Sequence, residues 1–206
     1  MRIAVINEVS ARAKNKDIVA ALKKNGQEVL NVGMTEGETK TELTYIHTGF
    51  MAAALLNLNA VDMVIGGCGT GQGFLNSAMQ YPNVFCGLIQ EPLDAFLFSQ
   101  INAGNCISLA LNKGYGWAGD LNLAYLFEKL FANNPGCGYP PERSESQRES
   151  RLKLQKITKA THKPFEEVLI ALDWEIIRTA LSHQPFYELI AAQGSLLFKN
   201  IMEELR

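Results

Sequence analysis

The chain has 206 residues, 47% of them hydrophobic, with 19 basic and 21 acidic side chains for a net charge of −2. This fits one domain of about 150 residues with a sizeable core and an appendage. The charge leaves no basic footprint, so we expect no nucleic-acid partner. The sequence starts directly with a strand, without a signal peptide, and no apolar run reaches the roughly 18 residues of a membrane span. We therefore expect a cytoplasmic protein with no membrane partner.

Four cysteines occur at positions 68, 86, 106 and 137, without a C-x-x-C pair and without clustering near the three histidines. This spacing argues against structural zinc, and a cytoplasmic chain keeps its thiols reduced. We predict no metal and no cofactor.

Strands and helices alternate along the first two thirds of the chain. Runs of β-branched and apolar residues predict five strands, at residues 3–6, 29–32, 61–65, 84–89 and 106–111. Apolar residues at helical spacing predict the helices between and after them, at about residues 11–25, 44–58, 73–80, 93–101 and 118–131. This order predicts an α/β fold with a doubly wound, mostly parallel, Rossmann-like sheet of five strands.

The third predicted strand runs into a cysteine and a glycine-rich turn. Glycines at 66, 67, 69, 71 and 73 allow a tight turn and present backbone N–H groups near the start of a helix. Cys68 would lie at the carboxyl end of the strand, where open α/β sheets bind ligands, and a thiol there is a usable base or nucleophile. On spacing alone, a buried structural cysteine is an equally good interpretation. The spacing matches neither a P-loop nor a dinucleotide-binding turn.

The order Gly-Cys-Gly-Thr-Gly-x-Gly after a Val-Asp-containing strand resembles the motif of the type B ribose-5-phosphate isomerase and galactose-6-phosphate isomerase family. The resemblance implies that Cys68 is the base that moves a proton between two sugar carbons. It also implies that the enediolate oxygen is held by Thr70 and by the backbone N–H groups of Gly69, Gly71 and Gly73. Aldose–ketose exchange needs both a base for a weakly acidic C–H and stabilisation of the oxyanion.

Two further segments compare with substrate-binding parts of that family. After its first strand the family carries Asp-His, and Asn7-Glu8 stand in that place here. Asn7 is then a substrate-binding or a turn residue, and Glu8 binds a sugar hydroxyl or is solvated. The family pattern Tyr-x-His at a helix start is matched by Tyr45-Ile-His47. His47 is a candidate substrate-binding residue, with a helix-capping or surface role as the alternative.

One family histidine is missing. Where the family has His-Asn followed by Asn, this chain has Ile101-Asn102 and then Asn105. In the family that histidine is linked to opening the sugar ring. Its work would fall to His47 or Glu8, or the substrate arrives open-chain, or the activity has changed. Asn102 binds a hydroxyl or forms a turn.

The family also has cationic residues that contact the substrate phosphate, two of them arginines four residues apart that often act across a dimer interface. The family often has one phosphate-contacting arginine near the start of the helix that follows the fifth strand, and Lys113 stands one position from that place. Arg143, Arg148 and Arg151 lie at spacings of five and three. Arginine suits phosphate because of its bidentate fork. We take Lys113, Arg143 and Arg148 as candidates, with solvated surface roles as the alternative.

The resemblance covers roughly residues 1–150, which we predict to form an α/β sugar-phosphate isomerase domain, followed by an all-helical C-terminal extension at 151–206. Pro164 and Pro185 each open a helical segment, and a last helix is expected at 196–205. The apolar stripes of these helices need a surface on the same subunit or on a partner. His162 and His183 are expected on the surface or at caps.

The sequence therefore predicts a sugar-phosphate isomerase of the ribose 5-phosphate or galactose 6-phosphate type, forming a homodimer or a dimer of dimers. One alternative is an isomerase or epimerase of another sugar, because the changes at Asn7-Glu8, at Ile101 and in the arginine spacing affect substrate contacts. Another is a non-catalytic sugar-binding protein that kept the anion-binding loop. Ile101 favours this last alternative, whereas the retained Cys68 argues against it.

Overall fold

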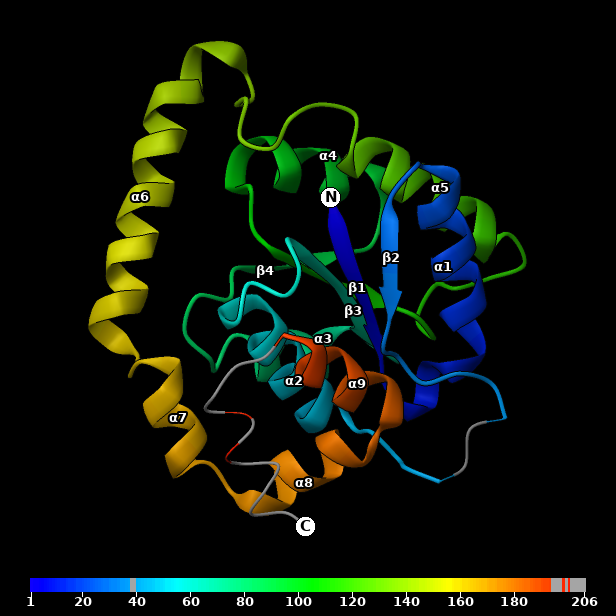
Figure 1. Ribbon diagram of the computed structural model, residues 1–206. Helices are drawn as coiled ribbons and strands as arrows, with labels where there is room; N and C mark the ends of the chain where they lie inside the picture. The colour runs from blue at the N-terminus through cyan, green and yellow to red at the C-terminus, as the bar shows by residue number, and fades with distance from the viewer. Residues whose placement is uncertain (38–39, 194–197, 199, 201–206) are drawn as a thin grey trace.

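The computed structural model describes residues 1–37, 40–193, 198 and 200. Its centre is a five-stranded sheet in the order β2-β1-β3-β5-β4, with every neighbouring pair parallel. The strands are β1 (Arg2–Asn7), β2 (Glu28–Asn31), β3 (Met63–Cys68), β4 (Cys86–Ile89) and β5 (Cys106–Ala110). Figure 1 shows the sheet between its helices. The predicted doubly wound α/β architecture is confirmed.

The helices fall between the strands where they were expected, and more follow β5. They are α1 (Asn15–Lys24), α2 (Tyr45–Asn57), α3 (Gln72–Ala78), α4 (Pro92–Leu97), α5 (Gly119–Leu130), α6 (Ser144–Thr161), α7 (Phe165–Ala171), α8 (Trp174–Ser182) and α9 (Gln184–Ala192). Short 3₁₀ helices occur at Val9–Lys14 (η1) and Pro141–Arg143 (η3), and a π-helical turn at Phe98–Asn102 (η2). Gly26 has a φ of +72° after α1, a left-handed conformation typical of the residue that follows a helix end.

Two apolar layers cover the sheet because successive side chains of a strand point to opposite faces. On β1, Ala4 and Ile6 join a cluster with α2, α3 and α7–α9, whereas Ile3 and Val5 join a cluster with α1, α4 and α5. Both faces are thus buried, as a parallel sheet requires.

The helical extension packs on the α2 side of the same chain. Phe186 of α9 is fully buried, and its ring meets that of Phe50 edge-on at 6.4 Å between centroids. The predicted boundary between residues 150 and 151 falls inside α6, and the division into two domains stays a prediction. In Figure 1, α6 runs along the side of the molecule where β4 forms the edge of the sheet. The helix expected at 196–205 lies almost entirely outside the described residues.

His183 lies at a helix cap, one of its two expected positions, but it is buried rather than on the surface. It is buried at the junction between α8 and α9, and its Nε2 lies 3.1 Å from the carbonyl oxygen of Val32. The segment that follows β2 covers it. Among the described residues, no helix combines the length and apolar character needed to cross a membrane.

Candidate active site

The order of strands reverses between β1 and β3, because β2 lies beside β1 on one side of this point and β5 lies beside β3 on the other. In open α/β sheets, ligands bind at the carboxyl ends of the strands beside such a point. Asn7 at the end of β1 pairs in register with Gly67, and the Glu8 N–H donates to the Gly67 carbonyl oxygen at 3.3 Å. The structure therefore brings Glu8 alongside the end of β3, where Cys68 is the last strand residue.

The turn after Cys68 is fixed by hydrogen bonds to the segment that follows β5. The Gly69 carbonyl oxygen accepts from the backbone N–H groups of Asn112, at 2.9 Å, and Lys113, at 3.0 Å. Gly71 has a φ of +76°, a left-handed conformation that favours glycine, and its carbonyl oxygen accepts from Ser108 Oγ at 2.6 Å. Lys113 is thus next to the glycine turn through its backbone, while its exposed side chain lines a cavity of about 150 Å³ beside β5.

Cys68 and Thr70 differ in their access to solvent. Cys68 is 4% exposed and belongs to the apolar cluster on the α2 side. Thr70 is exposed, and its Oγ1 accepts from the Gln72 N–H at 3.3 Å. Thr70 is therefore widely accessible to a ligand at this turn, whereas Cys68 is accessible only through a small exposed area.

Asn7 and Glu8 are both buried. Asn7 has no exposed surface; its Nδ2 donates to the Met34 carbonyl oxygen at 2.8 Å and its Oδ1 accepts from Asn15 Nδ2 at 2.7 Å. These contacts favour a structural role for Asn7, which is the last residue of β1 rather than a turn residue. Glu8 is 6% exposed rather than solvated, because its carboxylate accepts from the N–H of Ser10, at 3.2 Å, and from the Ser10 hydroxyl, and so caps η1.

His47 occupies the third position of α2 and is 8% exposed. Its Nδ1 accepts from the Thr44 N–H at 3.0 Å, which is the capping alternative, and its Nε2 lies 3.9 Å from Glu175 Oε2. Burial lowers the pKa of His47, and the Glu175 carboxylate opposes that change.

Three polar residues were not proposed as site residues. Tyr45, the first residue of α2, is 46% exposed and its ring lies against Gly73, where an added Cβ would come within 2.8 Å of Tyr45 Cγ. Asn112 Nδ2 donates to the Ser10 carbonyl oxygen at 3.0 Å, which links the ends of β5 and β1. The Tyr-x-His pattern was a signal for Tyr45, whereas Ser10 and Asn112 depend on tertiary contacts.

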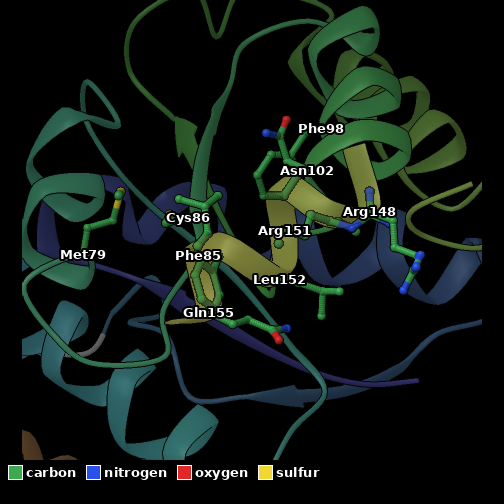
Figure 2. A pocket seen from close by; sticks show the side chains of 12 residues that line it. Met79, Phe85, Cys86, Phe98, Asn102, Arg148, Arg151, Leu152 and Gln155 are labelled. Carbon is green, nitrogen blue, oxygen red and sulfur yellow. The ribbon is translucent and has the colours of Figure 1, made fainter. Parts of the chain in front are cut away.

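Asn102, Arg148 and Arg151 lie at the amino ends of the strands, opposite the ends that carry Cys68 and the glycine turn. Asn102 precedes β5 and, with Arg148 and Arg151, lines a cavity of about 300 Å³ whose walls include Phe85 and Leu152 (Figure 2). The amino and carboxyl ends of β3 and β5 are separated by the length of the strands, which have six and five residues. This length is about 15–20 Å. Within one chain, these residues do not meet Cys68.

The arginines differ in their partners. The Arg148 guanidinium bonds both carboxylate oxygens of Glu145, at 2.6 and 3.0 Å, and this contact lowers the pKa of that carboxyl. Arg151 donates to the carbonyl oxygens of Ile101, at 2.8 Å, and Gly136, at 3.1 Å. Arg143 is exposed and donates to Ser146 Oγ at 3.3 Å. In the described part of the chain, no three His, Cys, Asp or Glu residues gather as a metal site.

The family model for ribose/galactose isomerase matches residues 3–134. The fold is similar to a ribose-5-phosphate isomerase from Vibrio parahaemolyticus, at 45% identity, and to a 4-deoxy-L-threo-5-hexosulose-uronate ketol-isomerase, at 38% identity. Each of these two covers 100% of this chain and 99% of the other chain, with a TM-score of 0.93. The type B ribose 5-phosphate isomerase of Leishmania infantum, 17% identical with a TM-score of 0.65, covers 78% of this chain and 98% of its own, and shows the fold alone. No curated protein matches.

Proposed function

Because the chain belongs to the ribose/galactose isomerase family, we propose that it interconverts an aldose and a ketose with Cys68 as the base and an enediolate intermediate. Such a sugar isomerase is an intramolecular oxidoreductase. It needs no redox cofactor, because one carbon is oxidised while its neighbour in the same molecule is reduced. The observation that carries the proposal is the position of the Cys68 turn at the end of β3, next to β1, where the strand order reverses.

The reaction transfers a proton from carbon 2 of the open-chain aldose to carbon 1, while a hydroxyl proton leaves oxygen 2 and oxygen 1 gains one. In the proposed mechanism the Cys68 thiolate takes the carbon-bound proton and returns it to the neighbouring carbon. Negative charge develops on the former carbonyl oxygen. Thr70 Oγ1 accepts from the Gln72 N–H, so its own hydrogen is the donor for that oxygen, together with the N–H groups of Gly69, Gly71 and Gly73.

The test of this mechanism is exchange of the substrate C–H proton with solvent deuterium, followed by NMR for the wild type, Cys68→Ala and Cys137→Ala. Cys137 is an exposed thiol and serves as the matched control. Loss of a general base reduces the rate roughly 10²- to 10⁴-fold, so we expect that loss in Cys68→Ala and wild-type exchange in Cys137→Ala. Wild-type exchange by Cys68→Ala would rule out Cys68 as the base.

Two substrate classes are proposed. The first is a sugar phosphate of the ribose 5-phosphate or galactose 6-phosphate type, supported by the family and by the Vibrio parahaemolyticus neighbour. The second is an unphosphorylated keto-uronate, supported by Ile101 and by the ketol-isomerase neighbour. The name of that neighbour's substrate places a ketone at carbon 5, where an aldohexose carries the hydroxyl that closes a six-membered ring. Such a substrate needs no ring-opening histidine.

The two classes are separated by measuring kcat/KM for ribose 5-phosphate, galactose 6-phosphate and the 5-keto-uronate with one preparation of the protein. Both classes carry an anionic group that suits arginine, so affinity alone does not separate them. A kcat/KM at least tenfold higher for one class assigns the substrate to it. Binding without turnover of any of the three would favour the non-catalytic sugar-binding alternative, and neither binding nor turnover would favour an isomerase or epimerase of another sugar.

We propose a homodimer in which Asn102 and Arg148 act on the substrate bound at Cys68 of the other copy. The support is that these residues line a cavity at the amino edge of the sheet, away from Cys68 of their own chain. Exposed apolar residues flank that cavity, among them Met79, Leu152 and Leu154. A second copy would cover them.

Mixed dimers of Cys68→Ala and Arg148→Ala chains test this arrangement. If each site combines residues of two copies, a mixed dimer has one site with both intact residues and about half of the wild-type activity, so an equimolar mixture that exchanges subunits freely regains about a quarter. If Arg148 acts within its own chain, both sites stay defective and mixing restores nothing. Sedimentation measures the oligomeric state separately.

We also propose a cytoplasmic location. Cys68, Cys86, Cys106 and Cys137 are free thiols in the structure, as is typical of proteins in a reducing compartment. Cell fractionation tests it, and recovery of the protein outside the cytoplasm would contradict the proposal.

A further inference from the structure

The helical extension contacts α2 and the segment after β2, near the carboxyl ends of the strands. Its helix α8 packs on α2 and buries Ile177 and Leu181 in the apolar cluster that also contains Phe50. Polar contacts join the same regions: Ser182 Oγ to Thr41 Oγ1 at 3.3 Å, His183 Nε2 to the Val32 carbonyl oxygen at 3.1 Å, and Glu175 Oε2 to His47 Nε2 at 3.9 Å. The last of these reaches a candidate site residue.

The two nitrogens of His47 face different partners. Nδ1 accepts the Thr44 N–H at 3.0 Å, so in the neutral ring the proton is on Nε2. Nε2 points to Glu175 at 3.9 Å. The His47 side chain is 10% exposed, whereas that of Glu175 is 69% exposed, so the carboxylate lies at the rim and the imidazole beneath it.

Glu175 is itself held on α8. Its Oε1 accepts from Thr179 Oγ1 at 3.0 Å, one helical turn later, which leaves Oε2 toward His47. Asp173 caps the helix by accepting the Glu175 N–H at 3.0 Å. A carboxylate in the first turn of a helix is also stabilised by the helix dipole. The carboxylate is therefore oriented by its own helix before it meets the imidazole.

The surroundings of His47 on its own helix are neutral, because its neighbours there are Thr44, Tyr45 and Thr48. Glu175 on α8 is the charged group that acts on the pKa of His47, and it favours the imidazolium against the effect of burial. A single carboxylate from outside the matched family segment, residues 3–134, thus acts on the charge of this ring.

We propose that Glu175 is a positioning residue through which the helical extension holds the orientation of the His47 ring at the start of α2. His47 stands two residues after Tyr45, whose ring lies on Gly73 of the glycine turn. Holding His47 therefore also holds the end of α2 that faces this turn. A contact between His47 and substrate rests on the function proposed above, whereas the link between Glu175 and His47 does not.

The link is tested by NMR titration of the histidine rings in the full chain, with the His47 signal assigned by its loss in His47→Gln. Glu175→Gln is compared with Glu166→Gln, which removes one exposed carboxylate from the first turn of α7 and changes the net charge equally. We expect the His47 midpoint to move to lower pH in Glu175→Gln alone. Glu175→Asp should move the midpoint back toward the wild type. Identical His47 titrations in Glu175→Gln and Glu166→Gln would overturn the proposal.

Steady-state kinetics on the same variants separate this link from the function of His47. If His47 binds substrate, KM rises several-fold in Glu175→Gln with little change in kcat, and Glu166→Gln behaves as the wild type. A shifted NMR midpoint with unchanged KM supports Glu175 as the positioning residue and overturns the substrate contact of His47. If the wild type shows no isomerase activity while Glu175→Gln still shifts the His47 titration midpoint, only the proposed function is contradicted.

Discussion

At the end of β1, one buried asparagine belongs to a hydrogen-bond network that joins three segments at the carboxyl end of the sheet. Asn7 bonds to Met34 after β2 and to Asn15 at the start of α1, and Asn15 also donates to Asn31 Oδ1 at 2.8 Å. Gly33 is required beside this network, because a Cβ there would lie 2.3 Å from Asn7 Oδ1. Asn7 thus links the segments that follow β1 and β2 to the start of α1.

We expect Asn7→Ala to lower the free energy of unfolding by about 1–3 kcal/mol, because it leaves buried partners on Met34 and Asn15 without their hydrogen bonds. Urea unfolding measures this, with Asn133→Ala, at an exposed loop position, as the control expected to change nothing. An Asn7→Ala protein of wild-type stability that has lost affinity for substrate would instead return Asn7 to the substrate-binding role.

The pH dependence of stability should carry a contribution from His47. Its pKa lies below the ordinary value of 6.5, since burial disfavours the imidazolium more than Glu175 favours it. The unfolded chain then binds the proton more readily. The stability gained from a neutral His47 is therefore present above about pH 6.5 and is lost as pH falls through the folded-state pKa.

His47→Gln should accordingly lose less stability than the wild type between about pH 7.5 and about pH 5.5, because it lacks this titration. Urea unfolding at both pH values measures the difference, and His162→Gln, which removes the histidine at the C-cap of α6, is the control. Equal pH dependence in all three proteins would show that the surroundings of His47 do not act on its protonation.

At the scale of elements, the contact between the start of α2 and the start of α3 is made by Tyr45 on Gly73. Alanine is normally better than glycine in a helix, by about 0.5–1 kcal/mol. At Gly73, however, the added Cβ would come within 2.8 Å of the Tyr45 ring. The ring is 46% exposed and has solvent into which it can turn.

We expect Gly73→Ala to leave the free energy of unfolding nearly unchanged and to raise KM several-fold, because the displaced ring alters the mouth of the glycine turn. Gly116→Ala is the matched control, since a Cβ there would meet nothing within 4 Å. The decisive measurement is a double-mutant cycle with Tyr45→Ala, in which the effect of Gly73→Ala should disappear. An undiminished effect in the Tyr45→Ala background would show that Gly73 acts through the backbone instead.

The elements were predictable from the sequence because they depend on local patterns. All five strands were found from runs of apolar and β-branched residues. The helix predicted at 11–25 instead begins as 3₁₀ helix η1, because the Glu8 side chain caps Ser10. The Asn7 network, the burial of His183 and the distance between Arg148 and Cys68 arise from segments far apart in the chain, for which one sequence carries no local signal.

At the scale of the whole molecule, the extension and the α/β core share one apolar cluster. Phe186, Ile177 and Leu181 of the extension lie in the same cluster as Phe50 and Met34 of the core. The apolar face of α2 is therefore completed by helices from the other end of the chain. Two regions joined in this way are expected to unfold together, because neither retains a covered core alone.

Phe186→Ala tests whether the regions beyond and before residue 150 are separate folding units. Phe186 is fully buried against Phe50, so its truncation should lower the free energy of unfolding by about 3–5 kcal/mol, whereas Tyr125→Ala at an exposed position of α5 should change it little. If the cluster unites the chain, fluorescence and circular dichroism report one transition, displaced as a whole to lower urea. If the extension is an independent domain, only a part of the signal shifts and the core keeps its wild-type midpoint. The second result would also place Glu175 in a different folding unit from Cys68. The shift of the His47 titration midpoint in Glu175→Gln would then disappear at the urea concentration where only the extension is unfolded.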